Sequence, residues 1–129
     1  MKRAAKSFGH AVEGLLHALK YERNLRLFVL GHTLVVSAAL LLRIDLLSIL
    51  LVTIMAGFFV VTELVNTAIE RVTDTFDDHL KSARGGHEHP GVKMAKDVGS
   101  AASLIALLMY GAVLLLTALP YIFYVIAHS

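Results

Sequence analysis

The chain opens with a segment in which apolar and charged residues alternate at helical spacing. Between residues 3 and 22 the apolar side chains return every three or four positions, while most lysines, histidines and glutamates fall on the other face. The apolar set is Phe8, Val12, Leu15, Leu16 and Leu19. Gly9 and Gly14 lower the intrinsic helicity, so this face needs a membrane or a bundle to hold it. We therefore predict an amphipathic helix at the membrane interface within residues 1–24.

Three long apolar stretches follow. The first covers residues 25–42, and the second begins at residue 46 and continues through a polar extension to residue 74. The third covers residues 94–127, with Pro120 expected to kink its outer end. Residues 43–45 leave room only for a tight turn, whereas residues 75–93 carry charges and turn formers and are predicted to form the main loop. Each stretch can cross a bilayer as a helix.

Composition agrees with a single membrane domain over residues 1–129. Hydrophobic residues make up 57% of the chain, and the mean hydropathy is +0.69, too apolar for an ordinary soluble domain. The absence of cysteine excludes disulfides, thiolate metal sites and a cysteine nucleophile. Lysines and arginines precede the first and third spans, whereas the turn at Arg43 and the C-terminus are poor in them. We therefore predict a cytoplasmic N-terminus and main loop, with the C-terminus outside, and no nucleic-acid partner.

The second apolar stretch ends in a polar stripe. At 100° per residue, one arc of this helix carries acids, amides and hydroxyls, while the opposite arc stays apolar. The stripe consists of Glu63, Asn66, Thr67, Glu70 and Asp74. Such a stripe could simply mark a helix emerging into water, but Glu63 and Asn66 lie directly behind the apolar run. Carboxylates near a bilayer normally face a partner or a cation, and oxygen ligands suit a divalent ion such as Mg²⁺.

Two motifs resemble one known family. Residues 63–70, Glu-Leu-Val-Asn-Thr-Ala-Ile-Glu, followed by Asp74, are similar to the signature of the small bacterial integral-membrane lipid kinases, the prokaryotic diacylglycerol kinase and undecaprenol kinase family. The second motif, residues 95–102, is Ala-Lys-Asp-Val-Gly-Ser-Ala-Ala. The resemblance implies a multi-pass homotrimer of the bacterial inner membrane, with active sites between subunits. It implies ATP-dependent phosphorylation of a lipid hydroxyl at the cytoplasmic face, giving phosphatidic acid or undecaprenyl phosphate.

The resemblance also implies roles for individual residues. Glu63 would be the general base, and Glu22 with Glu70 would hold Mg²⁺. Residues expected near ATP are Arg3, His10, Glu22, Glu70, Lys96 and Asp97, and residues expected to position groups are Asn66, Asp74 and Ser100. The chain has no Walker A motif and no kinase-type glycine loop, so its ATP site would be unlike the usual ones.

Two questions stay open at the level of sequence. The acceptor lipid is one, because residues 22–26 and the pair His89-Pro90 resemble the polyprenol branch, whereas residues 99–102 resemble the diacylglycerol branch. The activity itself is the other, since the acidic stripe could serve an ion or proton transport subunit. That alternative requires acids across the bilayer, and the first two spans offer only His32. His87 and His89 are interpreted as residues of a solvated or phosphate-neighbouring loop rather than as metal ligands.

Overall fold

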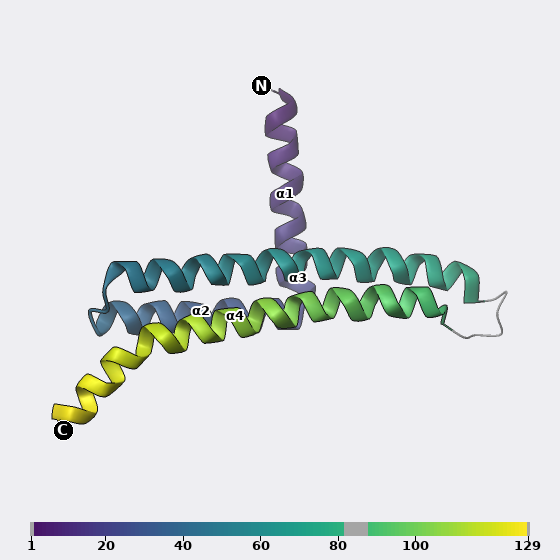
Figure 1. Ribbon diagram of the computed structural model, residues 1–129. Helices are drawn as coiled ribbons and strands as arrows, with labels where there is room; N and C mark the ends of the chain where they lie inside the picture. Colours follow the sequence, from purple (N-terminus) through teal and green to yellow (C-terminus); the bar gives the residue numbers. More distant parts are fainter. Residues whose placement is uncertain (1, 82–87, 129) are drawn as a thin grey trace.

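The computed structural model describes residues 2–81 and 88–128, which form four helices (Figure 1). They are α1 (Lys2–Tyr21), α2 (Arg23–Leu41), α3 (Leu46–Lys81) and α4 (Pro90–His128). Figure 1 shows α2, α3 and α4 side by side along one axis, with α1 running crosswise and projecting away from them. The most extensive packing is between α3 and α4, and α1 contacts both α2 and α3. The bundle is therefore formed by α2, α3 and α4, with α1 attached near its middle.

Two short breaks in the chain determine where α2 and α3 begin. Glu22 has an extended backbone between α1 and α2, and its side chain makes no capping hydrogen bond, so its carboxylate is available to other groups. Between α2 and α3, Arg43 adopts a left-handed backbone with φ 56°. The Asp45 carboxylate then caps α3 by accepting hydrogen bonds from the Ser48 amide at 2.9 Å and hydroxyl at 2.6 Å. The predicted tight turn is confirmed.

The Asp45 carboxylate also links α3 to α4 at one end of the bundle. Tyr121 of α4 donates a hydrogen bond to it at 2.7 Å. Hydrogen bonds from the Ser48 and Tyr121 side chains, with the Ser48 amide, lower the pKa of Asp45 to about 2. This cluster holds the start of α3 against the outer part of α4, where Pro120 lies inside the helix. Figure 1 shows this yellow end of α4 bending away from α3, in agreement with the predicted kink.

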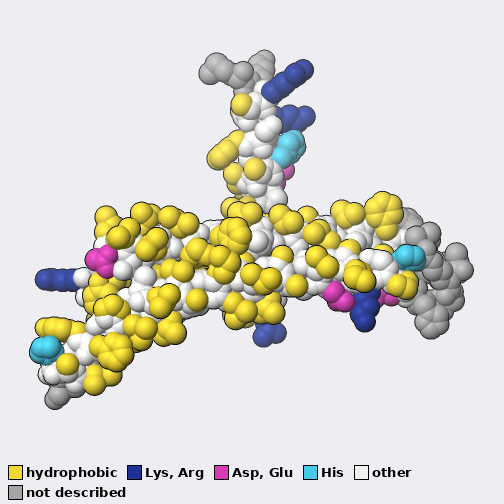
Figure 2. All heavy atoms as spheres, viewed as in Figure 1, with side chains coloured by type: hydrophobic (Ala, Val, Ile, Leu, Met, Phe, Trp, Pro, Cys, Tyr) yellow, Lys and Arg dark blue, Asp and Glu magenta, His cyan; other side chains and the backbone are white. Residues whose placement is uncertain are grey.

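The buried core is small, and the outside of the bundle is apolar. Val52, Ala56 and Tyr110 form its centre, with Phe28 packed against them. Many large apolar side chains are exposed, and Figure 2 shows them over most of one face of the bundle. Among the described residues, three helices are long and apolar enough to cross a membrane, namely Arg23–Leu41, Leu46–Asp78 and Pro90–His128. Because acyl chains would cover this surface, the predicted all-α membrane fold is confirmed.

The predicted loop over residues 75–93 is wrong in its extent. Helix α3 continues to Lys81, and α4 already begins at Pro90. Residues 75–81 are mostly polar but contain neither glycine nor proline, so nothing in them stops a helix. Pro90 occupies the first helical turn, where its missing N–H is not needed. The two helix ends are joined by buried Asp77, which accepts a hydrogen bond from the His89 amide at 3.1 Å. His87 lies outside the described residues.

Candidate active site

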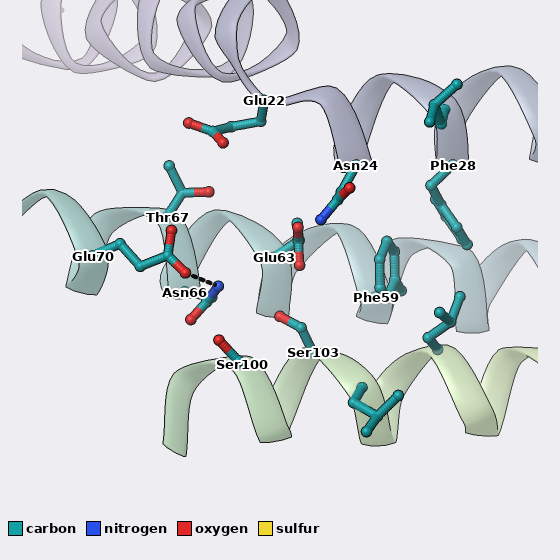
Figure 3. A pocket seen from close by; sticks show the side chains of 13 residues that line it. Glu22, Asn24, Phe28, Phe59, Glu63, Asn66, Thr67, Glu70, Ser100 and Ser103 are labelled. Carbon is teal, nitrogen blue, oxygen red and sulfur yellow. Dashed lines mark hydrogen bonds between the residues drawn. The ribbon is translucent and has the colours of Figure 1, made fainter. Parts of the chain in front are cut away.

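A cavity of about 480 Å³ opens between the three bundle helices and the α1–α2 junction (Figure 3). It has a polar end and an apolar end. The polar lining consists of Glu22, Asn24, Glu63, Asn66, Thr67, Glu70, Ser100 and Ser103. The apolar lining consists of Leu27, Phe28, Phe59, Leu104 and Leu107. We call this space the acidic cavity, because three carboxylates from two elements line it.

The polar stripe of α3 forms one wall of the acidic cavity. Glu63 and Asn66 are each only 8% exposed, so the stripe is not a helix surface emerging into water. The Asn66 amide nitrogen donates a hydrogen bond to Glu70 Oε1 at 2.9 Å, which fixes the Glu70 carboxylate. Asp74, one turn further along α3, lies outside the cavity, where its Oδ1 pairs with Lys96 Nζ at 2.7 Å. The helical spacing therefore predicted four of the five stripe residues at the cavity.

Helix α4 approaches this wall at a glycine. Gly99 is buried, and a Cβ atom added there would collide with Asn66 Oδ1. The missing side chain at Gly99 allows the backbones of α3 and α4 to approach closely. Asn66 Oδ1 is itself buried without a hydrogen-bond partner, as is the hydroxyl of Ser103 one turn further along α4. Both atoms belong to residues that line the acidic cavity.

Glu22 is held at the cavity by an arginine that the sequence reasoning missed. Arg71 Nη2 donates a hydrogen bond to Glu22 Oε1 at 3.0 Å, while Nη1 lies 2.5 Å from His17 Nε2. Arg71 thereby ties the end of α1 and the start of α2 to α3. Its position just off the polar stripe gave no signal, because only the crosswise packing of α1 brings His17 to it. Asn24 of α2, which also lines the cavity, was missed as well.

The remaining predicted residues lie away from the acidic cavity within this chain. Lys96 contacts Asp74, and also Glu88 Oε1 at 3.3 Å. Asp97 is exposed on the neighbouring part of α4. Arg3 and His10 sit on α1, where both are exposed. Of the second motif, Ser100 alone among the predicted residues lines the cavity.

The carboxylates of the acidic cavity are compatible with a divalent cation that arrives with a nucleotide. Within residues 2–81 and 88–128, no group of three or more metal-binding side chains is close enough to hold an ion by itself. Mg²⁺ commonly takes one or two carboxylates and fills its other positions with water and phosphate oxygens. Glu22 and Glu70 line the same cavity, so these two carboxylates could supply the protein's share of such a coordination sphere.

An aromatic cluster closes the apolar end of the acidic cavity. Phe28 of α2 packs on Phe59 of α3 with ring centroids 4.1 Å apart, and on Tyr110 of α4 at 5.0 Å. His32 Nδ1 of α2 lies 3.2 Å from the Tyr110 hydroxyl of α4, which forms a hydrogen bond between the two helices. The cluster separates the acidic cavity from the outer half of the bundle.

Comparison with known proteins places the chain among lipid kinases. Residues 9–118 match the family model for prokaryotic diacylglycerol kinase. An undecaprenol kinase of Bacillus subtilis is 28% identical over 102 residues, covering 79% of this chain and 76% of that protein. A diacylglycerol kinase of Pseudomonas aeruginosa is 31% identical over 107 residues, covering 83% of this chain and 80% of that protein.

A diacylglycerol kinase of Synechocystis sp. is 31% identical over 100 residues, which cover 78% of this chain. The chain spans about half of that relative, 53% of its length. The matched residues 9–118 include every residue that lines the acidic cavity. With most of its length matched in this way, the chain belongs to the prokaryotic diacylglycerol kinase family.

Proposed function

We propose that the protein is a lipid kinase that transfers the γ-phosphoryl group of ATP to the hydroxyl of a membrane lipid in the acidic cavity. The observation that carries this proposal is the position of buried Glu63 where the polar lining of the cavity meets the apolar lining. A lipid alcohol needs an apolar path for its chain and a base at its hydroxyl. The relatives named diacylglycerol kinase and undecaprenol kinase support the same reaction.

In the proposed reaction the lipid oxygen forms a new bond to the γ-phosphorus as the bond from that phosphorus to the ADP oxygen breaks. Glu63 accepts the hydroxyl proton, since it is the most deeply placed acid of the stripe. Glu22 and Glu70 would hold Mg²⁺, which supplies positive charge to the phosphate oxygens. Asn66 fixes the Glu70 carboxylate through its 2.9 Å hydrogen bond. Arg71 holds Glu22 beside the cavity.

We further propose a homotrimer in which Lys96, Asp97, Arg3 and His10 reach the nucleotide. Two features support it. These four residues lie away from the acidic cavity in the single chain, and α3 and α4 leave a groove of about 660 Å³ lined by small residues such as Ala95 and Ala102. The positive-inside pattern supports a location in the bacterial inner membrane with the N-terminus and main loop in the cytoplasm, where ATP is available.

Transport is the weaker explanation of the acidic stripe. No acidic residue occurs in the helices between Glu63 and Asp45 at the far end of the bundle. Along that path the polar pair His32 and Tyr110 is part of the packed aromatic cluster. A continuous ion or proton pathway would need further ionisable groups there.

The test is phosphate transfer from labelled Mg·ATP by the purified protein in mixed micelles, with dioctanoylglycerol and undecaprenol offered separately. We expect wild-type protein to label a lipid, and Glu63→Gln to lower the rate by about 10²- to 10⁴-fold, the contribution of a general base. Nucleotide binding should persist in this variant. Asp45→Asn, assayed at a temperature where it is still folded, is the matched control, because it changes an acid to an amide at the far end of the bundle. No transfer by folded wild-type protein would refute the kinase.

A further inference from the structure

One hydroxyl in the acidic cavity differs from most others in the spanning helices. Hydroxyl side chains in these helices commonly donate to the carbonyl oxygen four residues earlier, at 2.8 Å in each case. The residues that do so are Thr33, Ser37, Thr53, Thr73, Thr75 and Thr117. Ser103 is only 7% exposed, yet its hydroxyl has no partner. Its side chain is therefore turned away from its own backbone.

Leaving a buried hydroxyl unpaired costs about 1–3 kcal/mol, so the arrangement requires a reason. Figure 3 shows the Ser103 oxygen directed from α4 toward α3, on the side of Glu63 and Asn66. Neither residue supplies a hydrogen bond to it, because the Asn66 amide nitrogen is engaged by Glu70 and Ser103 Oγ has no partner. Ser103 thus carries a buried hydroxyl without a partner, on a residue that lines the cavity.

The position of Ser103 along the acidic cavity indicates which part of a substrate it meets. Ser100, one turn earlier on α4, belongs to the polar lining, whereas Leu104 and Leu107 belong to the apolar lining. Ser103 therefore stands at the boundary, opposite Glu63. This step rests on the proposed function: if the acceptor hydroxyl lies at Glu63, the first atoms of the lipid beyond it pass Ser103.

We propose that Ser103 donates a hydrogen bond to an ester oxygen of the acceptor lipid, and that it thereby favours a glycerolipid over a polyprenol. In a diacylglycerol an ester oxygen is attached to the carbon next to the one that bears the free hydroxyl. In a polyprenol everything beyond the hydroxyl is hydrocarbon, so the Ser103 hydroxyl would stay buried and unpaired. A site built to hydrogen-bond a substrate group discriminates strongly against an analogue that lacks it.

The experiment compares Ser103→Ala with wild-type protein in mixed micelles, using dioctanoylglycerol and undecaprenol as acceptors. For dioctanoylglycerol we expect kcat/KM to fall about 5- to 100-fold, mainly through a higher KM for the lipid, as the loss of one buried hydrogen bond predicts. For undecaprenol we expect no fall, and the KM for ATP should not move. Ser103→Thr, which keeps the hydroxyl, should keep the lipid preference. Without ATP or Mg²⁺, dioctanoylglycerol should raise the unfolding midpoint of wild-type protein more than that of Ser103→Ala.

Thr117→Ala is the matched control, since it removes a hydroxyl from the same helix that is bonded to its own backbone. Thr117→Ala should leave kcat/KM for both lipids unchanged. An equal effect of Ser103→Ala on both lipids, no effect on either, or a wild-type preference for undecaprenol would overturn the role of Ser103. Absence of transfer to both lipids by folded wild-type protein would instead overturn the kinase, and the role of Ser103 with it.

Discussion

Replacing Gly99 with alanine tests whether the contact between α3 and α4 shapes the acidic cavity. The added Cβ atom would meet Asn66 Oδ1, with the Asn66 backbone close behind at 3.8 Å. Two responses are available to the protein. Either α4 moves away from α3, or the Asn66 side chain rotates and gives up its hydrogen bond to Glu70. Both responses disturb the wall that carries the acids.

The two responses lower the free energy of unfolding by similar amounts. Overpacking a close contact costs about 1–3 kcal/mol of the free energy of unfolding. Losing the bond from the Asn66 amide to the Glu70 carboxylate costs about 1.5–3 kcal/mol, because its acceptor is charged. We therefore expect Gly99→Ala to destabilise the protein by about 1–3 kcal/mol. Lipid phosphorylation should fall even where the protein is still folded, because the Glu70 carboxylate loses its fixed position.

The assay is reversible unfolding in detergent micelles, followed by far-ultraviolet circular dichroism, together with phosphate transfer under conditions where the variant is folded. Gly111→Ala on the same helix is the control, since a Cβ atom there would meet nothing within 4 Å. This control should match wild-type protein or gain slightly in stability from its higher helix propensity. Equal stability and activity of Gly99→Ala and Gly111→Ala would refute the reasoning.

Two further predictions concern other contacts. Arg71→Ala removes the cation between His17 and Glu22, so we expect faster amide hydrogen exchange in α1. Arg71→Lys keeps the charge and should restore part of the protection. Unchanged exchange in both variants would contradict this role. The lowered pKa of Asp45, about 2, means that its charged form stabilises the fold. This stabilisation is complete above pH ~4 and is lost as the pH falls through ~2. The unfolding midpoint of Asp45→Asn should therefore lie below that of wild-type protein at pH ~6, and the gap should close toward pH ~2. A gap independent of pH would rule out the charged carboxylate as its source.

The sequence predicted the site best where helix geometry alone decides which residues share a face. Glu63, Asn66 and Glu70 are spaced three and four residues apart, so any helix brings them to one wall. The long loop failed because the residues that follow Asp74 are polar, and polarity is equally compatible with a solvated helix. Lys96 was expected near ATP together with Glu70, but in this chain it lies against Asp74, one turn away from Glu70, and only the register between α3 and α4 determines that contact.

Arg71 and Ser103 could not have been found from the sequence for a different reason. Their importance depends on partners from other helices, or on the lack of one. Arg71 looks like an ordinary surface cation until α1 crosses beside it. Ser103 looks like one more small residue of α4 until its hydroxyl is seen without a backbone partner. Both facts depend on tertiary packing, which the spacing of residues along one helix does not determine.

The crosswise helix α1 determines how deep the bundle lies in the membrane. Its apolar face is open, with Phe8 71% and Leu16 60% exposed, so the surface layer of a membrane can cover it. A single residue, Glu22, separates α1 from α2, so the depth of α1 at the membrane surface fixes the depth of the start of α2. Helix α2 has 19 residues and so measures about 28 Å, close to the ~30 Å of a typical hydrocarbon core. The acids of the cavity beside Glu22 are thereby held at the depth where lipid headgroups end and acyl chains begin. In a thicker bilayer, the lipid around the protein would thin and the acids would stay at that depth.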